Sequence, residues 1–323
     1  MRVINTNNNI NLLKIILSLF IVSGHLFPEL YNGQPESYVY CFIRGLARLS
    51  VPLFLIITGY YIRSKTNEFG YILIRIKKLF FIFIVWQIIY FKIELDSYQL
   101  GQISSKSFFL DMLYGIGHLW YLSSVILSLF LIYFTSCCSN KVKFIMSFVL
   151  LIISYFLQIN NHLKFIDSKF LDEFYFYIGT YRNFLFYAFP YLLLGTNYDY
   201  WKKYCIKNIY LGYLIFFIFL IVELAVYYYF KSPVYNLFIV SFPFSLFSFN
   251  HIVNIKKQVK FNFPETLSLG IYLIHFYVLY LFYTKINIMN SFSYFYLYIF
   301  LVILTVIIWF ILDKINKKIK IFF

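Results

Sequence analysis

The sequence predicts an all-α protein, a polytopic membrane helix bundle of about ten transmembrane helices with both termini in the cytoplasm. Composition is the first reason. The 323 residues are 62% hydrophobic and have a mean hydropathy of +0.75, whereas soluble domains are closer to half apolar. The second reason is that apolar runs of about 20 residues, long enough to cross a bilayer, recur along the whole chain. Because no soluble stretch is long enough for another domain, residues 1–323 are predicted to form a single integral-membrane domain.

Helical spans surrounded by membrane lipid are predicted, in order, at 10–31, 39–62, 79–95, 116–135, 144–158, 181–198, 209–230, 235–252, 264–284 and 294–313. Each must be a helix because a single segment in lipid has to satisfy its own backbone hydrogen bonds. The first lacks a small-residue cleavage site after its apolar run, so it is interpreted as a retained span and not as a signal peptide. Lys92 and Glu94 interrupt the third span, and Pro52 and Gly59 permit a bend or a close helix contact in the second.

The positions of Lys and Arg predict the orientation. Most of the 28 basic residues fall in alternate loops that include both termini, and few fall in the other loops. Cytoplasmic loops collect Lys and Arg, so both termini are placed in the cytoplasm. The membrane that the chain crosses is expected to be the inner or plasma membrane of the cell. The same bias accounts for the net charge of +15 without nucleic acid as a partner. The four cysteines show neither metal-ligand spacing nor a disulfide framework, so no metal site is predicted.

The first span, NLLKIILSLFIVSGHLFPEL, contains Lys14, His25 and Glu29. Eleven positions along a helix return a side chain to nearly the same face, so Lys14 and His25 lie on one stripe about 16 Å apart, with Ser18 between them. A polar stripe facing lipid is unfavourable, so we expect this one to face the bundle interior or a cavity. Taken singly, the lysine also fits a snorkelling side chain, the histidine a packing residue, and Glu29 a solvated position at the outer interface.

The second span contains Arg44 and Arg48, which are four residues apart and share a face. Arginines at that depth need a carboxylate, a phosphate or a water-filled cavity. The alternative is a structural role in which Glu29 or Glu36 neutralises the pair.

Histidines of three spans are predicted to lie at comparable depth, which suggests a shared cavity. They are His25, His118 of the fourth span and His275 of the ninth. Trp120 follows His118 near the outer surface, where an aromatic belt residue is also typical. Tyr272 shares a helix face with His275.

Arg75, Lys77 and Lys78 lie at the cytoplasmic mouth of the third span. Such a cluster is often only a topological anchor, and it also suits the phosphates of an anionic cofactor.

Together, the sequence segments around these residues resemble the membrane acyltransferase family 3. Its first span carries a basic residue, ten intervening positions and a histidine, as Lys14 and His25 do in LLKIILSLFIVSGH. The segments RLSVPLFLIITGYYI, RIKKLFFIFIVW, HLWYLSSVI and SLGIYLIHFYVLY are similar to later blocks of the family, and the resemblance covers residues 10 to 284 in order. The family prefers Arg at position 14, an acidic residue where Asn11 stands and Ser where Thr58 stands.

The resemblance implies an O-acyltransferase that moves an acetyl group from cytoplasmic acetyl-CoA to an extracytoplasmic or lipid-linked sugar, such as an O-antigen, capsule or exopolysaccharide unit. His25 would be the general base or transient acyl carrier, oriented by Glu29. The distance along the first span matches an extended pantetheine arm, with the CoA phosphates held by Lys14, Arg75 and Lys78. The acceptor would contact residues from several spans: Arg44, Arg48, His118, Trp120, Tyr272 and His275.

A transporter or flippase of a lipid-linked saccharide is the competing class, because buried Arg and His also suit glycan binding without bond chemistry. A polysaccharide polymerase is a third class, but it usually has a large outer loop, and the longest one here, residues 159 to 180, is modest. Consumption of acetyl-CoA separates the enzyme from the transporter.

Overall fold

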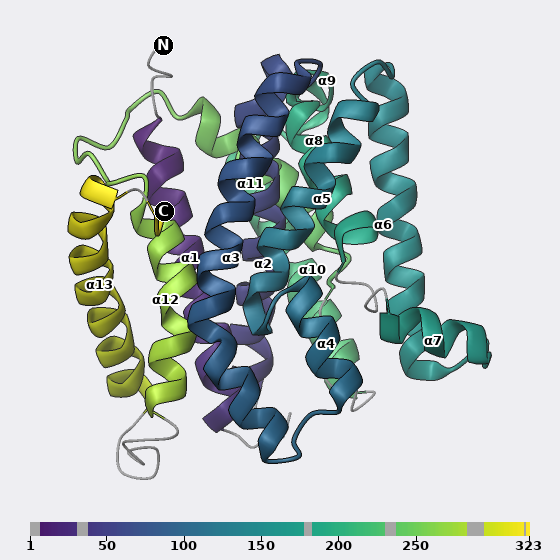
Figure 1. Ribbon diagram of the computed structural model, residues 1–323. Helices are drawn as coiled ribbons and strands as arrows, with labels where there is room; N and C mark the ends of the chain where they lie inside the picture. Colours follow the sequence, from purple (N-terminus) through teal and green to yellow (C-terminus); the bar gives the residue numbers. More distant parts are fainter. Residues whose placement is uncertain (1–6, 31–37, 178–182, 230–236, 283–293, 320) are drawn as a thin grey trace. The chain divides into compact units, whose positions relative to one another are not determined.

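The computed structural model describes residues 7–30, 38–177, 183–229, 237–282, 294–319 and 321–323. Every regular element in these residues is a helix and none is a strand, which confirms the all-α class (Figure 1). The chain divides into two compact units. The first comprises Met1–Phe54, Ile206–Val234 and Val240–Phe323, and the second comprises Leu55–Cys205 and Tyr235–Ile239. That the whole chain is one integral-membrane domain stays a prediction.

The first unit consists of long helices. They are α1 (Asn8–Leu30), residues 38–54 of α2 (Tyr38–Ile62), α10 (Ile209–Tyr229), α11 (Ser241–Asn254), α12 (Leu267–Leu281) and α13 (Tyr294–Ile319).

The second unit mixes long helices with short ones. It contains the rest of α2, η1 (Arg63–Lys65), α3 (Phe69–Gln99), α4 (Ser105–Tyr114), η2 (Gly117–Leu119), α5 (Trp120–Phe134), α6 (Asn140–Leu163), α7 (Lys169–Tyr177), the π-helical turn η3 (Phe184–Ala188), α8 (Phe189–Thr196), α9 (Tyr198–Trp201) and η4 (Lys202–Tyr204).

Each of the ten predicted spans contains a helix. Among the described residues, six helical segments are long and apolar enough to cross a membrane: Asn8–Leu26, Gly45–Lys65, Gly117–Phe134, Asn140–Asn161, Ile209–Val226 and Phe295–Ile319. The chain is therefore a multi-pass membrane protein. Crossing by the other four predicted segments and the cytoplasmic location of both termini stay predictions.

Helix α3 is longer than the third predicted span. It has 31 residues and begins at Phe69, so Arg75 and Lys78 lie within the helix and not in a loop before it. Lys92 and Glu94 do not end the helix either, because charged residues are compatible with helical backbone and no proline follows until the helix is over. Hydropathy located the apolar part of this segment but not its boundaries.

Local capping residues set the ends of α4, one of the short helices in the second unit. The Ser104 hydroxyl accepts a hydrogen bond from the Ser107 backbone N–H at its start. At its end, Gly115 has φ +115°, a conformation that strongly favours glycine. These signals turn the chain sharply between α4 and α5.

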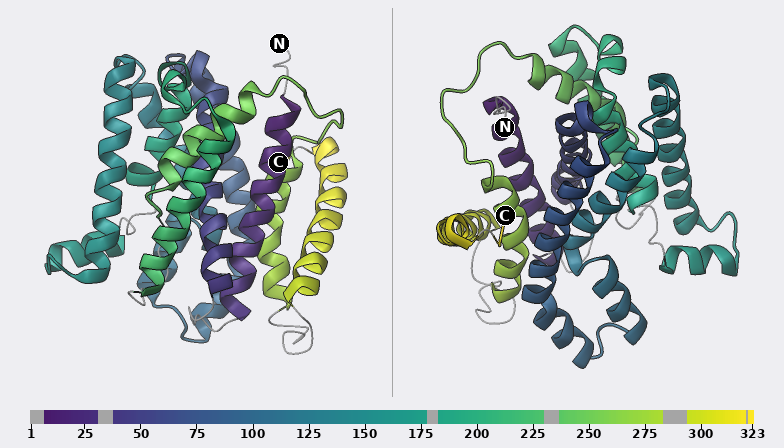
Figure 2. Two further views of the ribbon diagram at one scale, coloured as in Figure 1. Left: turned by 180° about the vertical axis from the view of Figure 1, so that it is seen from behind. Right: turned by 45° about the horizontal axis from the view of Figure 1, so that its top comes forward.

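In the first unit, α1 packs against α11, α12 and α13, and α12 lies alongside α13 (Figures 1 and 2). Glycines permit the closest approaches. A methyl group added to Gly270 of α12 would meet the indole of Trp309 on α13, and one added to Gly24 of α1 would lie 2.6 Å from the Cβ of Ala47 on α2. Larger residues there would push the helices apart.

In the second unit, α5 packs against α3, α8 and η3, and α6 packs against α8 and η3. The part of α2 in this unit crosses α8 at two glycines. A Cβ on Gly59 would lie 3.0 Å from the Cα of Gly195 and closer still to the Leu192 carbonyl oxygen. Of the bend and the close contact that the sequence permits here, the structure has the close contact at Gly59, because small residues let helix backbones approach.

Candidate functional site

The imidazoles of His25 and His275 meet between α1 and α12 in the first unit. Their ring centres are 5.3 Å apart, with the planes tilted by 47°. Phe276 packs edge-on against His25 at 5.9 Å, and the Tyr272 ring lies 6.4 Å from that of His275. Residues about 250 positions apart in sequence therefore form one aromatic cluster. We call its two imidazoles, His25 and His275, the histidine pair.

The orientation of His275 follows from its backbone contact. Its Nδ1 is 3.0 Å from the Ile271 carbonyl oxygen. A carbonyl can only accept, so Nδ1 carries the hydrogen in this bond and the lone pair of a neutral ring falls on Nε2. The side chain is 1% exposed, so the protein holds it in this position.

The polar stripe of α1 faces the interior of its unit. Ser18 is fully buried and donates to the Ile15 carbonyl oxygen at 2.8 Å. Asn11 is 2% exposed, and its carboxamide has no hydrogen-bond partner among the described residues. His25 and Lys14 are half-buried. The stripe is thus directed inward, as its polarity predicts.

Lys14 interacts electrostatically with the carboxylate of Glu265, which lies just before α12. Glu265 is exposed. The sequence gives no sign of this partner, since the two residues are far apart in the chain and neither belongs to a paired motif.

The connection between α11 and α12 is fastened to the start of α1 (Figure 2). The Asn8 Nδ2 donates to the Val259 carbonyl oxygen at 3.2 Å, and the Asn9 Nδ2 donates to that of Lys257 at 3.3 Å. In return, the Val259 N–H donates to the Asn9 Oδ1 at 3.0 Å. Three exposed lysines therefore lie on a loop fixed near the beginning of the stripe: Lys256, Lys257 and Lys260.

Arg48 belongs to the first unit and is half-buried. Its neighbour Ala47 marks the crossing with Gly24 of α1, and His25 follows Gly24. Positions 25 and 48 are therefore each one residue from the same helix crossing. The side chains of Arg44 and Glu29, and residue 36, lie outside the described residues.

The remaining predicted site residues belong to the second unit. His118 is 3% exposed and packs edge-on against Tyr90 at 5.3 Å. Trp120 is half-buried beside Tyr187, 6.2 Å between ring centres. Arg75 and Lys78 are exposed on α3, where Arg75 donates to the Tyr71 hydroxyl at 2.9 Å. The gathering of His118 with the histidine pair, and of Arg75 with Lys14, stays a prediction.

An acyltransferase-domain family model matches residues 7–314. The chain belongs to acyltransferase family 3. Neither a curated protein nor a solved structure is significantly similar to it. The family match includes the whole polar stripe of α1 and both residues of the histidine pair.

For an acyltransferase of family 3, the structure adds groups that the sequence did not single out. The lysines of the α11–α12 connection were interpreted only as orientation signals. Asp111 of α4 shares a side-chain hydrogen bond with Glu94 of α3, and burial raises the pKa of the Asp111 carboxyl. Two carboxyl groups can share a hydrogen bond only when one holds a proton. No spacing in the sequence indicates this pair.

Proposed function

We propose that this acyltransferase moves an acetyl group from cytoplasmic acetyl-CoA to a hydroxyl of an extracytoplasmic or lipid-linked sugar, in the inner or plasma membrane. A surface-polysaccharide unit is the proposed acceptor. The observation that carries the proposal is the inward-facing stripe of α1, with a basic residue near its start and an imidazole further along that meets a second imidazole.

The start of the stripe supports binding of a polyanionic donor. Lys14 lies there beside a loop with three exposed lysines, held by the hydrogen bonds of Asn8 and Asn9. Lysine binds phosphate as a compact point charge. The buried carboxamide of Asn11 adds both a donor and an acceptor on the same face. Arg75 and Lys78 are further proposed phosphate contacts.

The histidine pair supplies the chemistry. An alcohol is a weak nucleophile until its proton is removed, and an imidazole suits that task near neutral pH. In the direct route, His25 takes the hydroxyl proton while the oxygen attacks the thioester carbonyl. The tetrahedral intermediate then collapses, the C–S bond breaks, and the CoA thiolate receives the proton from the imidazolium.

A covalent route uses the same residue. The His25 nitrogen attacks the thioester carbonyl, the C–S bond breaks, and CoA leaves as the thiol with the imidazole proton. The sugar hydroxyl then attacks the acetyl-imidazole, the C–N bond breaks, and the hydroxyl proton returns to the imidazole. Arg48, one residue from the crossing at Gly24, is proposed to stabilise the oxyanion in either route. Glu29 and His275 are proposed to orient His25, and Arg44, His118, Trp120 and Tyr272 to contact the acceptor.

The decisive experiment measures release of CoA thiol from acetyl-CoA by the purified chain in lipid nanodiscs, with and without a membrane extract containing lipid-linked saccharides. We expect acceptor-dependent release, and a drop of at least about 100-fold in His25→Ala, the lower end of what a general base contributes. His251→Ala is the matched control, because its imidazole in the same unit contacts Tyr213.

Undiminished turnover in correctly folded His25→Ala would reject the role of His25. Saccharide translocation without consumption of acetyl-CoA would reject the enzyme in favour of a transporter.

A further inference from the structure

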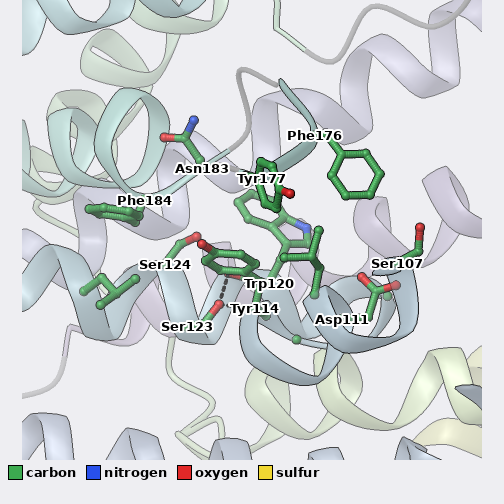
Figure 3. A pocket seen from close by; sticks show the side chains of 14 residues that line it. Ser107, Asp111, Tyr114, Trp120, Ser123, Ser124, Phe176, Tyr177, Asn183 and Phe184 are labelled. Atoms are coloured by element: carbon green, nitrogen blue, oxygen red, sulfur yellow. Dashed lines mark hydrogen bonds between the residues drawn. The ribbon is translucent and has the colours of Figure 1, made fainter. Parts of the chain in front are cut away.

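A cavity of about 270 Å³ opens beside Trp120 in the second unit (Figure 3). Its walls come from α4, the turn at Gly115 and Gly117, α5, α7, Asn183 and the first residue of η3. Aromatic rings form a large part of it, among them Trp120, Phe176 and Tyr177. Helices α4 and α7 lie in loops that are predicted to be extracytoplasmic.

The aromatic walls are held by specific contacts. Trp120 packs against Tyr187 of η3. The Lys106 ammonium of α4 lies 4.0 Å from the ring centres of both Phe176 and Tyr177, which joins α7 to α4 by cation–π contacts. The rings therefore present fixed faces.

Polar groups stand on either side of Trp120, with Asp111 on one side and Asn183 on the other (Figure 3). The Asn183 Oδ1 accepts the backbone N–H groups of Leu185 at 3.0 Å and Phe186 at 2.8 Å. Asp111 is fixed through its hydrogen bond with Glu94. Both side chains are thus oriented before any ligand arrives.

Gln87 of α3 fixes the backbone of the cavity. Its Nε2 donates to the carbonyl oxygens of Asp111 at 3.1 Å and Met112 at 2.9 Å, and its Oε1 accepts the Ile116 N–H at 2.9 Å. Ser123, also in the lining, donates to the carbonyl oxygens of Trp120 at 2.9 Å and of Tyr114. A concave site in which polar side chains are held in fixed positions among aromatic rings is a usual form of a small-molecule site.

We propose that this cavity binds one sugar ring of the acyl acceptor. A pyranose has an apolar face of C–H groups, which packs on aromatic rings, and hydroxyls at its edge, which bond to carboxyl and amide groups. The volume is close to the lower limit of about 300 Å³ for small-molecule sites, which suits a single ring and not an oligosaccharide. The choice of a sugar as occupant rests on the proposed function, whereas the site itself rests on its geometry.

The test uses the full chain in nanodiscs and a panel of free monosaccharides: glucose, galactose, rhamnose and N-acetylglucosamine. Saturation-transfer difference NMR should detect ring protons of at least one sugar. We expect Trp120→Leu to reduce the signal at least tenfold and Asp111→Asn at least threefold. Phe109→Leu is the matched control, because Phe109 is exposed on α4 and does not line the cavity. If Trp120→Leu fails to fold, Tyr177→Leu at a half-exposed wall position replaces it.

A second readout separates this inference from the proposed function. Trp120→Leu should raise the KM for the acceptor, whereas Phe109→Leu should leave both this KM and the hydrolysis of acetyl-CoA without acceptor unchanged. Equal sugar signals in wild type and Trp120→Leu would overturn the cavity assignment, as would the absence of any sugar signal in an active wild type. It would also be overturned if phosphatidylethanolamine, but not a competing sugar, suppressed the sugar signal. Trp120-dependent sugar binding by a chain that never consumes acetyl-CoA would support the cavity and reject the acyltransfer chemistry proposed above.

Discussion

Lys14 and Glu265 carry opposite charges and interact electrostatically. Their interaction has either a structural role or a role in binding a phosphate, and single substitutions distinguish the two. Electrostatic attraction between partly exposed charges stabilises a protein little, since even a surface ion pair typically contributes only about 0–1 kcal/mol. The pair is therefore a weak structural element. Because the Glu265 carboxylate is exposed, Lys14 is able to exchange it for a phosphate, which is what the proposed role in donor binding requires.

We predict that Lys14→Gln lowers the affinity for CoA roughly tenfold, which corresponds to about 1.4 kcal/mol, because one phosphate contact is lost. Glu265→Gln should bind CoA as tightly as wild type or more tightly, because it removes a competing negative charge. Isothermal titration with CoA measures both.

A purely structural pair would give a different pattern. Both single variants would then lose thermal stability without loss of affinity, and Lys14→Glu combined with Glu265→Lys would restore it. That pattern would contradict the phosphate role.

The His25–His275 contact is also decided at the scale of single residues. Hydrogen bonding of the His275 Nδ1 to Ile271 fixes which nitrogen carries the lone pair, and the ring contact places that imidazole against His25. Such second partners commonly orient catalytic histidines. The pair is therefore the part of the site in which geometry and proposed chemistry agree most closely.

At the scale of elements, glycines set the closest helix contacts. Gly59 of α2 and Gly195 of α8 face one another so closely that a Cβ on either would meet backbone atoms, and backbone cannot move aside as a flexible side chain can. Gly70, near the start of α3, has open space around its Cα.

We predict that Gly59→Ala destabilises the purified protein by about 1–3 kcal/mol, the usual range for overpacking. Gly70→Ala should be neutral or stabilising by up to about 1 kcal/mol, since alanine is the better helix former. Thermal unfolding in detergent, followed by near-UV circular dichroism, tests the pair. An unchanged melting temperature in Gly59→Ala would show that α2 and α8 do not cross at this point.

Short helices outside the predicted spans matter at the same scale. Helices α4 and α7 fall between spans, yet both line the cavity beside Trp120. Hydropathy treats such segments only as loops, because it registers length in lipid and not the shape of what lies outside it.

At the scale of the whole molecule, the property to be measured is the orientation of the chain in the membrane. The thiols provide a direct measure. Cys137 is exposed between α5 and α6, in a segment predicted to be cytoplasmic. Burial raises the pKa of the Cys205 thiol to about 11, so that little reactive thiolate is present there near neutral pH.

We predict that a membrane-impermeant maleimide labels a variant with Cys137 as its only cysteine in inverted vesicles and not in right-side-out vesicles. Ser105→Cys on a cysteine-free background is the matched control, because Ser105 is exposed at the start of α4 and should show the opposite pattern. Labelling of Cys137 from the outer side would invert the predicted topology and remove the cytoplasmic origin of the donor.

How much of this could be predicted from the sequence depends on the range of the interaction. The all-α class, a helix in each of the ten segments and the common face of Lys14, Ser18 and His25 follow from hydropathy and the 3.6-residue period. These properties are fixed within one or two helical turns, so no knowledge of neighbours is needed. The two ends of α3 were wrong by up to ten residues because charged residues continue a helix as well as apolar ones do.

The sequence by itself determined that the chain is a helical membrane protein with an inward-facing basic and imidazole stripe in its first span, and its motif blocks indicated the acyltransferase family. Only the tertiary structure decided that His25 meets His275, that Glu265 accompanies Lys14, and that a lysine-bearing loop is fastened to the start of α1. The cavity beside Trp120 was likewise decided only by the tertiary structure. The reason is physical: periodicity fixes a face along one helix, whereas lateral neighbours depend on how side chains from distant segments pack together.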